Sequence, residues 1–319
     1  MRRYIFRRLL MLFPVIIGVS LLIFLILNLA PGDIISVISG DGMSAEEVQA
    51  LRAELGYDKP VLVRYLRYMS GLIRGDLGTS YITGRSVFHA YIERLPATMR
   101  LAFSSVLFSI LLSIPLGIYS ATHKGSIRDN ISMVGALLGL SMPNFWLGLL
   151  LIIAFSLNIK IFPSSGDTGF LSLVLPTITV GTGLMATLTR TTRSSMLDVI
   201  RQDYLRTARA KGVPEKKVIR KHALKNALIP IITIIGTQLS NVLGGAVLTE
   251  TVFSWPGVGR LIVDSINQRD IPMVTGCIIL KTITITIILL IVDLLYAAVD
   301  PRVKSRFAGA RKKRRTAQS

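Results

Sequence analysis

Cysteine and histidine are nearly absent from this chain of 319 residues, which excludes two common ways of stabilising a fold. Cys277 is the only cysteine, so no intrachain disulfide can form, and its apolar surroundings favour a packing role over thiol chemistry. The three histidines, His89, His123 and His222, lie far apart and lack the spacing of zinc ligands. We therefore expect no metal site.

Motifs for nucleotide binding and hydrolysis are also missing. The sequence has no Gly-x-x-x-x-Gly-Lys-Ser/Thr loop, so the chain is not expected to bind ATP through a phosphate-cradling loop. It has neither a Gly-x-Ser-x-Gly nucleophile elbow nor a His-Glu-x-x-His zinc helix. We therefore expect a non-catalytic protein with no cofactor of its own.

Long apolar stretches are abundant: hydrophobic residues make up 51% of the chain, and the mean hydropathy is +0.57. About 20 predominantly apolar residues suffice to cross a bilayer as an α-helix. Such stretches occur at residues 9–29, 98–120, 131–157, 171–188, 229–248 and 273–298. The first is too long for a signal-peptide core, so we interpret it as an uncleaved span. The sequence predicts an all-α integral membrane protein with six transmembrane helices.

Acidic residues are scarce, with 18 Asp and Glu against 37 Lys and Arg. Most of the basic residues lie at the N-terminus, in the loops after the second and fourth spans, and in the C-terminal tail. The positive-inside rule then places both termini in the cytoplasm. Nucleic-acid binding is not expected, because it requires a basic face on a soluble domain. The basic run at 311–315 either contacts anionic membrane lipid or is simply solvated, and we favour solvation.

The predicted spans divide the chain into four regions. Residues 1–30 form the cytoplasmic N-terminus and first span, 31–96 an extracytoplasmic subdomain, 97–300 a five-helix core, and 301–319 a basic cytoplasmic tail. An apolar stripe predicts an amphipathic helix at 61–72, and two glycines predict a turn at 75–80. A second external segment, at 251–272, carries a turn signal at Trp255-Pro256-Gly257.

The basic loop at about 190–228 is too long for a simple connection between two membrane helices. Its sequence predicts two short helices separated at Gly212, which suits a helix C-cap, with Pro214 and Glu215 in the first turn of the second helix. An apolar stripe with helical spacing predicts a shared face in the first helix; it contains Leu197, Ile200, Tyr204 and Ala208. An ordered, charged helical pair is suited to docking a soluble partner. A solvated loop that merely follows the positive-inside rule explains the pattern equally well.

Two features within the spans are typical of a translocation pathway. Lys281 lies eight residues into the last span, about 12 Å of helix rise from its outer end, where a charge is costly unless it faces a polar cavity or a partner. Gly244 and Gly245 loosen the fifth span. The alternatives are a lysine that extends to the membrane surface and ordinary helix packing at the glycines.

Short motifs in a fixed order carry a family resemblance. They are Ala30-Pro31-Gly32-Asp33, Leu55-Gly56-Tyr57-Asp58-Lys59-Pro60, Gly75-Asp76-Leu77-Gly78, Leu95-Pro96-Ala97-Thr98, Glu250, Trp255-Pro256-Gly257-Val258-Gly259 and Asp300-Pro301-Arg302. The chain resembles the B-type permease subunits of dipeptide and oligopeptide ABC importers over nearly its whole length. Its basic loop is similar to the family's EAA loop. Arg206, Thr207 and Ala208 occupy the Glu-Ala-Ala positions and Gly212 the glycine, while Leu224 alone fits the downstream element.

The resemblance implies a type I ABC importer permease bundle of the MetI-like kind in a bacterial inner or plasma membrane. Such a subunit forms half of a translocation pathway with a second permease subunit. It receives substrate from an extracytoplasmic solute-binding protein and couples to two cytoplasmic ATPase subunits, which bind the ATP. The residues implied to form the ATPase-coupling loop are Tyr204, Arg206, Thr207, Ala208, Gly212, Glu215 and Leu224.

The substrate class and the transport mechanism stay open at the level of sequence. Peptides are the favoured substrate, while nickel and oligosaccharides are the alternatives that the same branch carries. An ion-coupled secondary transporter would use buried ion sites and inverted repeats. The sequence shows no clear inverted pair, and Lys281 is the only deep charge in the predicted spans. A membrane-embedded enzyme would need a converging set of His, Asp, Glu or Cys within the spans, and no such set occurs.

The charge asymmetry gives a testable topology. With Cys277 replaced, cysteines introduced at Ser44 and Gly166 are expected to react with a membrane-impermeant thiol reagent in intact cells. Cysteines at Lys216 and Ala317 are expected to react only after the cells are opened. Labelling of Lys216→Cys in sealed cells would contradict this orientation.

Overall fold

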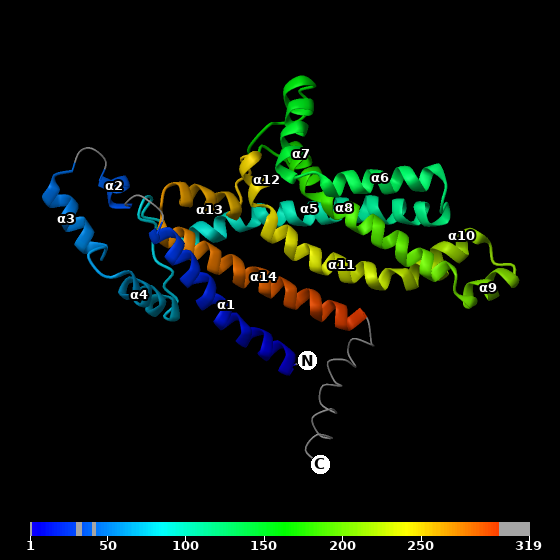
Figure 1. The fold of residues 1–319 in the computed structure, drawn as a ribbon, viewed down its shortest axis with the longest axis horizontal. Helices are drawn as coiled ribbons and strands as arrows, with labels where there is room; N and C mark the ends of the chain where they lie inside the picture. The colour runs from blue at the N-terminus through cyan, green and yellow to red at the C-terminus, as the bar shows by residue number, and fades with distance from the viewer. Residues whose placement is uncertain (1, 30–33, 40–42, 300–319) are drawn as a thin grey trace, which may run out of the picture. The chain divides into compact units, whose positions relative to one another are not determined.

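The computed structural model describes residues 2–29, 34–39 and 43–299, which are almost entirely helical (Figure 1). The sequence motifs at 30–33 and 300–302 and the basic tail lie outside the described residues. The helices are α1 (Arg2–Leu29), α2 (Ile34–Ser39), α3 (Ala45–Glu54), α4 (Val61–Ile73), α5 (Val87–Thr122), α6 (Ile127–Ser141), α7 (Asn144–Leu151), η1 (Ile152–Asn158), α8 (Phe170–Ile200), α9 (Asp203–Ala210), α10 (Glu215–Lys217), η2 (Val218–Ala223), α11 (Leu224–Gly245), α12 (Val247–Val252), α13 (Val258–Asn267) and α14 (Ile271–Val299). Here η marks a π-helix.

Several of these helices are candidates to cross a membrane. Five helical stretches are long and apolar enough to cross a bilayer, namely Arg8–Leu29, Val87–Thr122, Phe170–Ile200, Glu215–Gly245 and Ile271–Leu294. A sixth span results if the bent pair Ile127–Ser141 and Asn144–Asn158 counts as one. Each predicted span therefore corresponds to a helix or a helix pair. The predicted start of the second span at residue 98 was wrong, because α5 begins at Val87 and includes Pro96.

The third predicted span, 131–157, is not a single straight helix. Helix α6 ends at Ser141, and the chain bends by 103° before α7 begins at Asn144. Met142 is extended, with φ −78° and ψ 124°, as expected for a residue that precedes proline. Pro143 then supplies the N-cap position of α7. One proline thus divides an apolar stretch that hydropathy alone joins.

The described residues fold as two compact units, those within 1–98 and 256–287 and those within 99–255 and 288–299. The core of the first unit joins α5, α13 and α14, and its buried side chains include Tyr91, Ile262 and Cys277. Full burial of Cys277 agrees with a packing role. Asp270, which directly precedes α14, connects this part of the unit to the segment before α5. It accepts hydrogen bonds from the Ser80 hydroxyl and from the backbone N–H of Tyr81.

Two helices, α3 and α4, follow the first span, and only α4 was expected from the sequence. Ser44 and Glu47 form a reciprocal capping box at the start of α3. Helix α4 matches the predicted amphipathic helix, and Tyr65 on its buried face packs edge-on against Phe24 of α1 with ring centroids 5.5 Å apart. The predicted turn at 75–80 is present, with positive φ at Gly75 and Gly78.

In the second unit, α5 and α8 pack closely because glycines lie at two of their contacts. A Cβ added to Gly117 would lie 2.5 Å from the side chain of Thr192, and one added to Gly181 would lie 2.6 Å from Phe108. The hydroxyl of Ser109 also donates a hydrogen bond of 2.8 Å to the carbonyl of Gly181. Small residues at such contacts permit the close backbone approach common between membrane helices.

An ion pair holds α6 against α8 in the same unit. Asp129, only 2% exposed, accepts two hydrogen bonds of 2.7 Å from the guanidinium of Arg193. The Ser120 hydroxyl and the backbone N–H of Gly125 donate to the same carboxylate. These hydrogen bonds offset most of the free energy that desolvation of the Asp129 carboxylate costs. Loss of any one donor would leave the buried carboxylate short of a hydrogen bond.

Candidate functional site

The basic loop is shorter than the sequence predicts. Helix α8 continues to Ile200, so the first short helix is α9 alone, with Arg201 and Gln202 separating the two. The second predicted short helix is not separate, because Glu215–Gly245 forms one continuous helical stretch through α10, η2 and α11. No proline or glycine occurs between Glu215 and Ile229 to end that helix.

Gly212 ends α9 in a Schellman motif, as its glycine predicts. Its φ is +77°, in the left-handed region. The N–H of Val213 donates a hydrogen bond of 3.2 Å to the carbonyl of Ala208. The N–H of Gly212 donates a hydrogen bond of 2.9 Å to the carbonyl of Arg209. Val213 and Ala208 also pack on the same hydrophobic cluster, which is the apolar contact that usually accompanies this motif.

A bidentate ion pair bridges the turn that Gly212 creates. Arg209 donates through Nε and Nη2 to the two carboxylate oxygens of Glu215, each at 2.9 Å. These hydrogen bonds raise the pKa of Arg209 above its ordinary value. Both side chains are partly exposed, so the pair contributes at most about 1 kcal/mol to stability. Its main effect is geometric, since the planar fork fixes the end of α9 against the start of α10.

A hydrophobic cluster under α9, which we call the loop base, anchors the helix to the bundle. Its buried members are Ala121, Met196, Leu205, Val218, Ile219, Ala223 and Ala227. These residues come from α5, α8, α9, η2 and α11, so a single cluster joins the surface helix to three membrane helices. Leu205 is fully buried and is the only buried residue of α9.

The predicted apolar face of the first helix was wrong at Tyr204. That residue is 42% exposed, while its neighbour Leu205 is fully buried. The helical register restarts at α9 after the break at Arg201 and Gln202, so the stripe that runs through Leu197 and Ile200 does not continue to Tyr204. Leu197, Ile200 and Ala208 do pack against the loop base.

Tyr204 instead links α9 to the opposite arm of the loop through hydrogen bonds. Its hydroxyl donates to the carbonyl of His222 at 3.4 Å and accepts from Nδ2 of Asn226 at 2.7 Å. Leu224 packs against the loop base from the first residue of α11. Of the predicted loop residues, Tyr204, Ala208, Gly212, Glu215 and Leu224 therefore all help to hold α9 in place.

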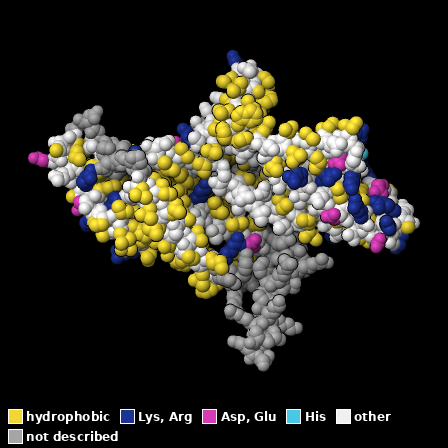
Figure 2. Space-filling model, in the orientation of Figure 1, with side chains coloured by type: hydrophobic (Ala, Val, Ile, Leu, Met, Phe, Trp, Pro, Cys, Tyr) yellow, Lys and Arg dark blue, Asp and Glu magenta, His cyan; other side chains and the backbone are white. Residues whose placement is uncertain are grey.

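The outer surface of the loop is strongly basic. Figure 2 shows Lys and Arg side chains gathered around α9 and α10. Between residues 201 and 221 the exposed cations are Arg201, Arg206, Lys211, Lys216, Lys217, Arg220 and Lys221. Arg206 is 80% exposed and lies 3.8 Å from Asp203, a pair that is too solvated to fix either side chain. Thr207 is also exposed, with its hydroxyl bonded to the carbonyl of Asp203. This arrangement suits docking of a partner.

The predicted pathway residues lie in different units. Lys281 is half-buried in the part of α14 that belongs to the first unit. Gly244 and Gly245 end α11 in the second unit, where both are exposed and a Cβ on either would meet no atom within 4 Å. Their role in transport stays a prediction. Among residues 2–29, 34–39 and 43–299, no three His, Cys, Asp or Glu side chains lie close enough to hold a metal ion.

Sequence reasoning missed three residues that hold the loop. Leu205 and Asn226 carry no motif, and only the helix break at Arg201 predicts which residue of α9 faces inward. The role of Arg209 was predictable, because opposite charges on either side of a Gly-Val-Pro turn predict an ion pair across that turn. The pair of Asp129 with Arg193 was missed too, since 64 positions separate the partners in sequence.

Comparison with known proteins gives a consistent match over nearly the whole chain. A family model described as "Binding-protein-dependent transport system inner membrane component" matches residues 113–305, and the model for the N-terminal part of such components matches residues 1–102. The dipeptide transport system permease protein DppB of Escherichia coli (strain K12) is 39% identical, with 96% of this chain and 100% of that protein covered. The oligopeptide transport system permease protein AppB of Bacillus subtilis (strain 168) is 40% identical, with 95% and 100% covered.

A third relative and a solved structure extend this comparison. The glutathione transport system permease protein GsiC of Salmonella paratyphi A is 38% identical, with 95% of this chain and 99% of that protein covered. Among solved structures, the MetNI methionine ABC transporter in an inward-facing conformation matches with a TM-score of 0.57 at 18% identity. That match covers 67% of this chain and 97% of the other and shows a shared fold.

The Schellman turn at Gly212 predicts a specific response to substitution. Gly212→Val is expected to loosen α9, because a β-branched residue fits φ of +77° poorly, at a cost of about 1–2 kcal/mol. A Cβ there meets no atom within 4 Å, so the effect comes from backbone strain alone. Trypsin cleavage within 201–217 should accelerate about tenfold. Gly212→Asn, which tolerates this geometry, is the matched control. Equal cleavage rates for the valine and asparagine variants would show that the turn does not hold α9.

Proposed function

The chain belongs to the family of binding-protein-dependent transport system inner membrane components, and we propose that within this family it is a peptide permease whose basic loop docks cytoplasmic ATPase subunits. It is a multi-pass inner-membrane permease subunit of an ABC importer, with the type I permease fold that the sequence predicts. The peptide substrate rests on one observation. The relatives that match along nearly the whole chain are permeases for dipeptides, glutathione and oligopeptides.

The coupling role rests on how firmly α9 is attached. A surface helix transmits a push only if it moves as one body with the elements beneath it. Leu205 anchors α9 in the loop base, the Schellman turn and the Arg209–Glu215 pair fix its end, and Tyr204 ties it to α11. Because the loop base also includes side chains of α5 and α8, a displacement of α9 would reach three membrane helices together.

The division of labour follows from this role. The chain forms one half of the translocation pathway, and a second permease subunit forms the other. Two ATPase subunits bind and hydrolyse ATP, and an extracytoplasmic solute-binding protein delivers the peptide. This chain holds no cofactor and performs no bond chemistry, and both of its termini face the cytoplasm. Residues 201–224 carry the contact with the ATPase.

Reconstitution tests the proposed function directly. The permease, a second permease subunit and the ATPases are placed in proteoliposomes, and uptake of a labelled dipeptide is measured with ATP and with its non-hydrolysable analogue. Uptake that requires ATP, the solute-binding protein and all membrane subunits is expected. Uptake driven by an ion gradient in the absence of ATP would instead identify a secondary transporter. ATP-dependent uptake of nickel or an oligosaccharide, with no peptide transport, would contradict the substrate class.

Arg206 offers a test of the docking surface. Arg206→Glu should weaken binding of the ATPase about tenfold, because the exposed side chain contributes to a basic surface and to no fixed internal contact. Arg74→Glu reverses the charge of an exposed arginine in the segment predicted to lie on the other side of the membrane, so it serves as the control. The measurement is ATPase retention on immobilised permease across salt concentrations. Equal retention by the two variants would exclude a direct contact at Arg206.

Lys281 offers a test of the pathway. We expect Lys281→Met to change the apparent affinity for acidic relative to neutral peptides by about tenfold, because it removes a charge able to attract a carboxylate. Lys281→Arg, which keeps the charge, should retain the wild-type preference. The measurement is competition among acidic, neutral and basic dipeptides for uptake, with complex assembly checked by size-exclusion chromatography. Unchanged preference in an assembled Lys281→Met complex would place this lysine outside the pathway.

A further inference from the structure

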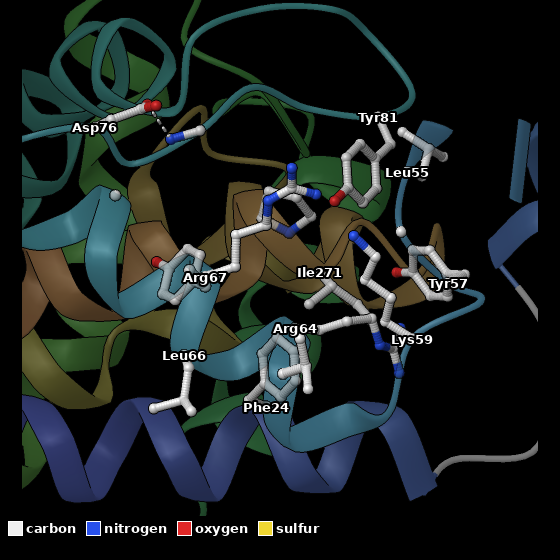
Figure 3. Close-up of a pocket in the computed structure, with 16 residues that line it drawn as sticks. Phe24, Leu55, Tyr57, Lys59, Arg64, Leu66, Arg67, Asp76, Tyr81 and Ile271 are labelled. Carbon is white, nitrogen blue, oxygen red and sulfur yellow. Dashed lines mark hydrogen bonds between the residues drawn. The ribbon is translucent and has the colours of Figure 1, made fainter. Parts of the chain in front are cut away.

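The first unit contains a basic cavity of 610 Å³ that the transport function does not explain. Residues of α1, of the segment before α4, of α4 itself, of the turn after it and of the start of α14 line this cavity. In Figure 3, Phe24 and Leu66 lie on the α1 side of the cavity. The same view shows Lys59, Arg67 and Tyr81 directing their polar ends toward one another farther from α1.

Positive charge dominates the lining of the basic cavity. Lys59, Arg64 and Arg67 contribute to it, while Asp76 is the single acid among the residues that line it. Asp76 is already engaged, since its carboxylate accepts a hydrogen bond of 2.8 Å from the N–H of Gly78 in the adjacent turn. The cavity therefore has unbalanced positive charge and favours an anion.

Two of the three cations are available to a ligand. Arg64 is held in place, because its guanidinium stacks 4.3 Å from the ring centroid of Tyr57 and donates to the Asn28 side chain. The side chains of Lys59 and Arg67, by contrast, form no hydrogen bond or ion pair with any residue that the structure describes. A rigid guanidinium beside two uncommitted cations is an arrangement typical of binding sites for phosphate groups.

Tyr81 adds a hydroxyl donor to this group. Burial, with a further contribution from Asp270, raises the pKa of Tyr81, so its phenol stays protonated at neutral pH. Burial likewise raises the pKa of Tyr68, another residue that lines the cavity. Neutral hydroxyls donate hydrogen bonds to an anion without adding a competing negative charge.

The position of the basic cavity on α1 indicates what kind of anion it takes. Phe24 lies five residues before the end of the α1 span at Leu29, which is about 8 Å of helix rise. If the α1 span ends at the edge of the hydrocarbon core, the cavity lies close to the level of the lipid headgroups. Helix α4 carries exposed apolar side chains next to its arginines, with Leu62 64% and Leu66 58% exposed, as expected for a helix that lies in this interface.

We propose that the basic cavity binds the phosphate of an anionic phospholipid from the leaflet at which α1 ends. Lys59, Arg67 and Tyr81 bind the phosphate oxygens, and the acyl chains extend past Phe24 and Leu66 along the apolar surface of α1. A free inorganic phosphate would satisfy the cations but would leave that apolar wall unused. The lipid joins α4 to α1 and thereby steadies the segment between the first two spans.

Lipid binding to the assembled transporter tests this proposal. The complete complex is delipidated in detergent and titrated with phosphatidylglycerol, with phosphatidylcholine and with inorganic phosphate, and bound lipid is counted by native mass spectrometry. Phosphatidylglycerol should bind in preference to phosphatidylcholine, and inorganic phosphate should not displace it. The variant Lys59→Gln/Arg67→Gln should bind phosphatidylglycerol at least about tenfold more weakly, because charge-assisted hydrogen bonds are lost.

Matched variants separate this site from general surface charge. The control Arg74→Gln/Arg85→Gln removes two exposed charges from the same unit, and neither residue lines the basic cavity. It should bind phosphatidylglycerol as the wild type does, and Lys59→Arg should restore binding lost in Lys59→Gln. Equal loss in the control pair, or wild-type binding by Lys59→Gln/Arg67→Gln, would overturn the proposal. Displacement of the lipid by inorganic phosphate would identify a free-anion site instead. If the double variant does not assemble, equal affinity of the wild type for the two lipids would overturn it.

Discussion

Burial of Leu205 in the loop base is the contact on which the candidate site depends. An eight-residue helix in water is marginal on its own, so α9 needs tertiary contacts to exist. Complete burial of a leucine side chain is worth about 1.5–3 kcal/mol, more than the surface ion pair across the turn contributes. The Schellman turn and the ion pair then set the direction of a helix that the loop base already holds. Without this contact the basic residues of α9 would belong to a solvated loop.

The sequence predicts the spans and the turn at Gly212 because each depends on a local property. Apolar length determines whether a helix can cross the bilayer, and only glycine adopts the left-handed C′ position at low cost. The inward position of Leu205 was not predictable in this way, because it depends on a helix break that has no proline or glycine to mark it. The bend at Pro143 was marked by its proline, but hydropathy averaged over a long window conceals a single residue.

Basic residues serve two separate purposes in this protein. Arg193 and Arg209 form bidentate pairs with Asp129 and Glu215, so they stabilise the junction of α6 with α8 and the turn after α9. The exposed cations of α9 and α10 make no comparable pairs with carboxylates in the part of the chain that the structure describes. The positive-inside rule accounts for the number of charges on this side of the membrane, but it cannot say which arginines are structural. Only the position of a carboxylate partner, often distant in sequence, distinguishes the two groups.

This distinction limits how the loop can bind a partner. Exposed charges separated by more than about 8 Å are largely screened at physiological salt, so in the proposed docking role the basic surface would accelerate and orient binding of the partner more than it would strengthen it. The affinity must then come from shape and from apolar groups near α9, such as the half-exposed ring of Tyr204. Because hydrogen bonds fix that ring to the opposite arm of the loop, a partner that pressed on it would push both arms at once. A rigid contact of this kind is what a transport cycle requires of a coupling element, since motion absorbed within the loop would not reach the membrane helices.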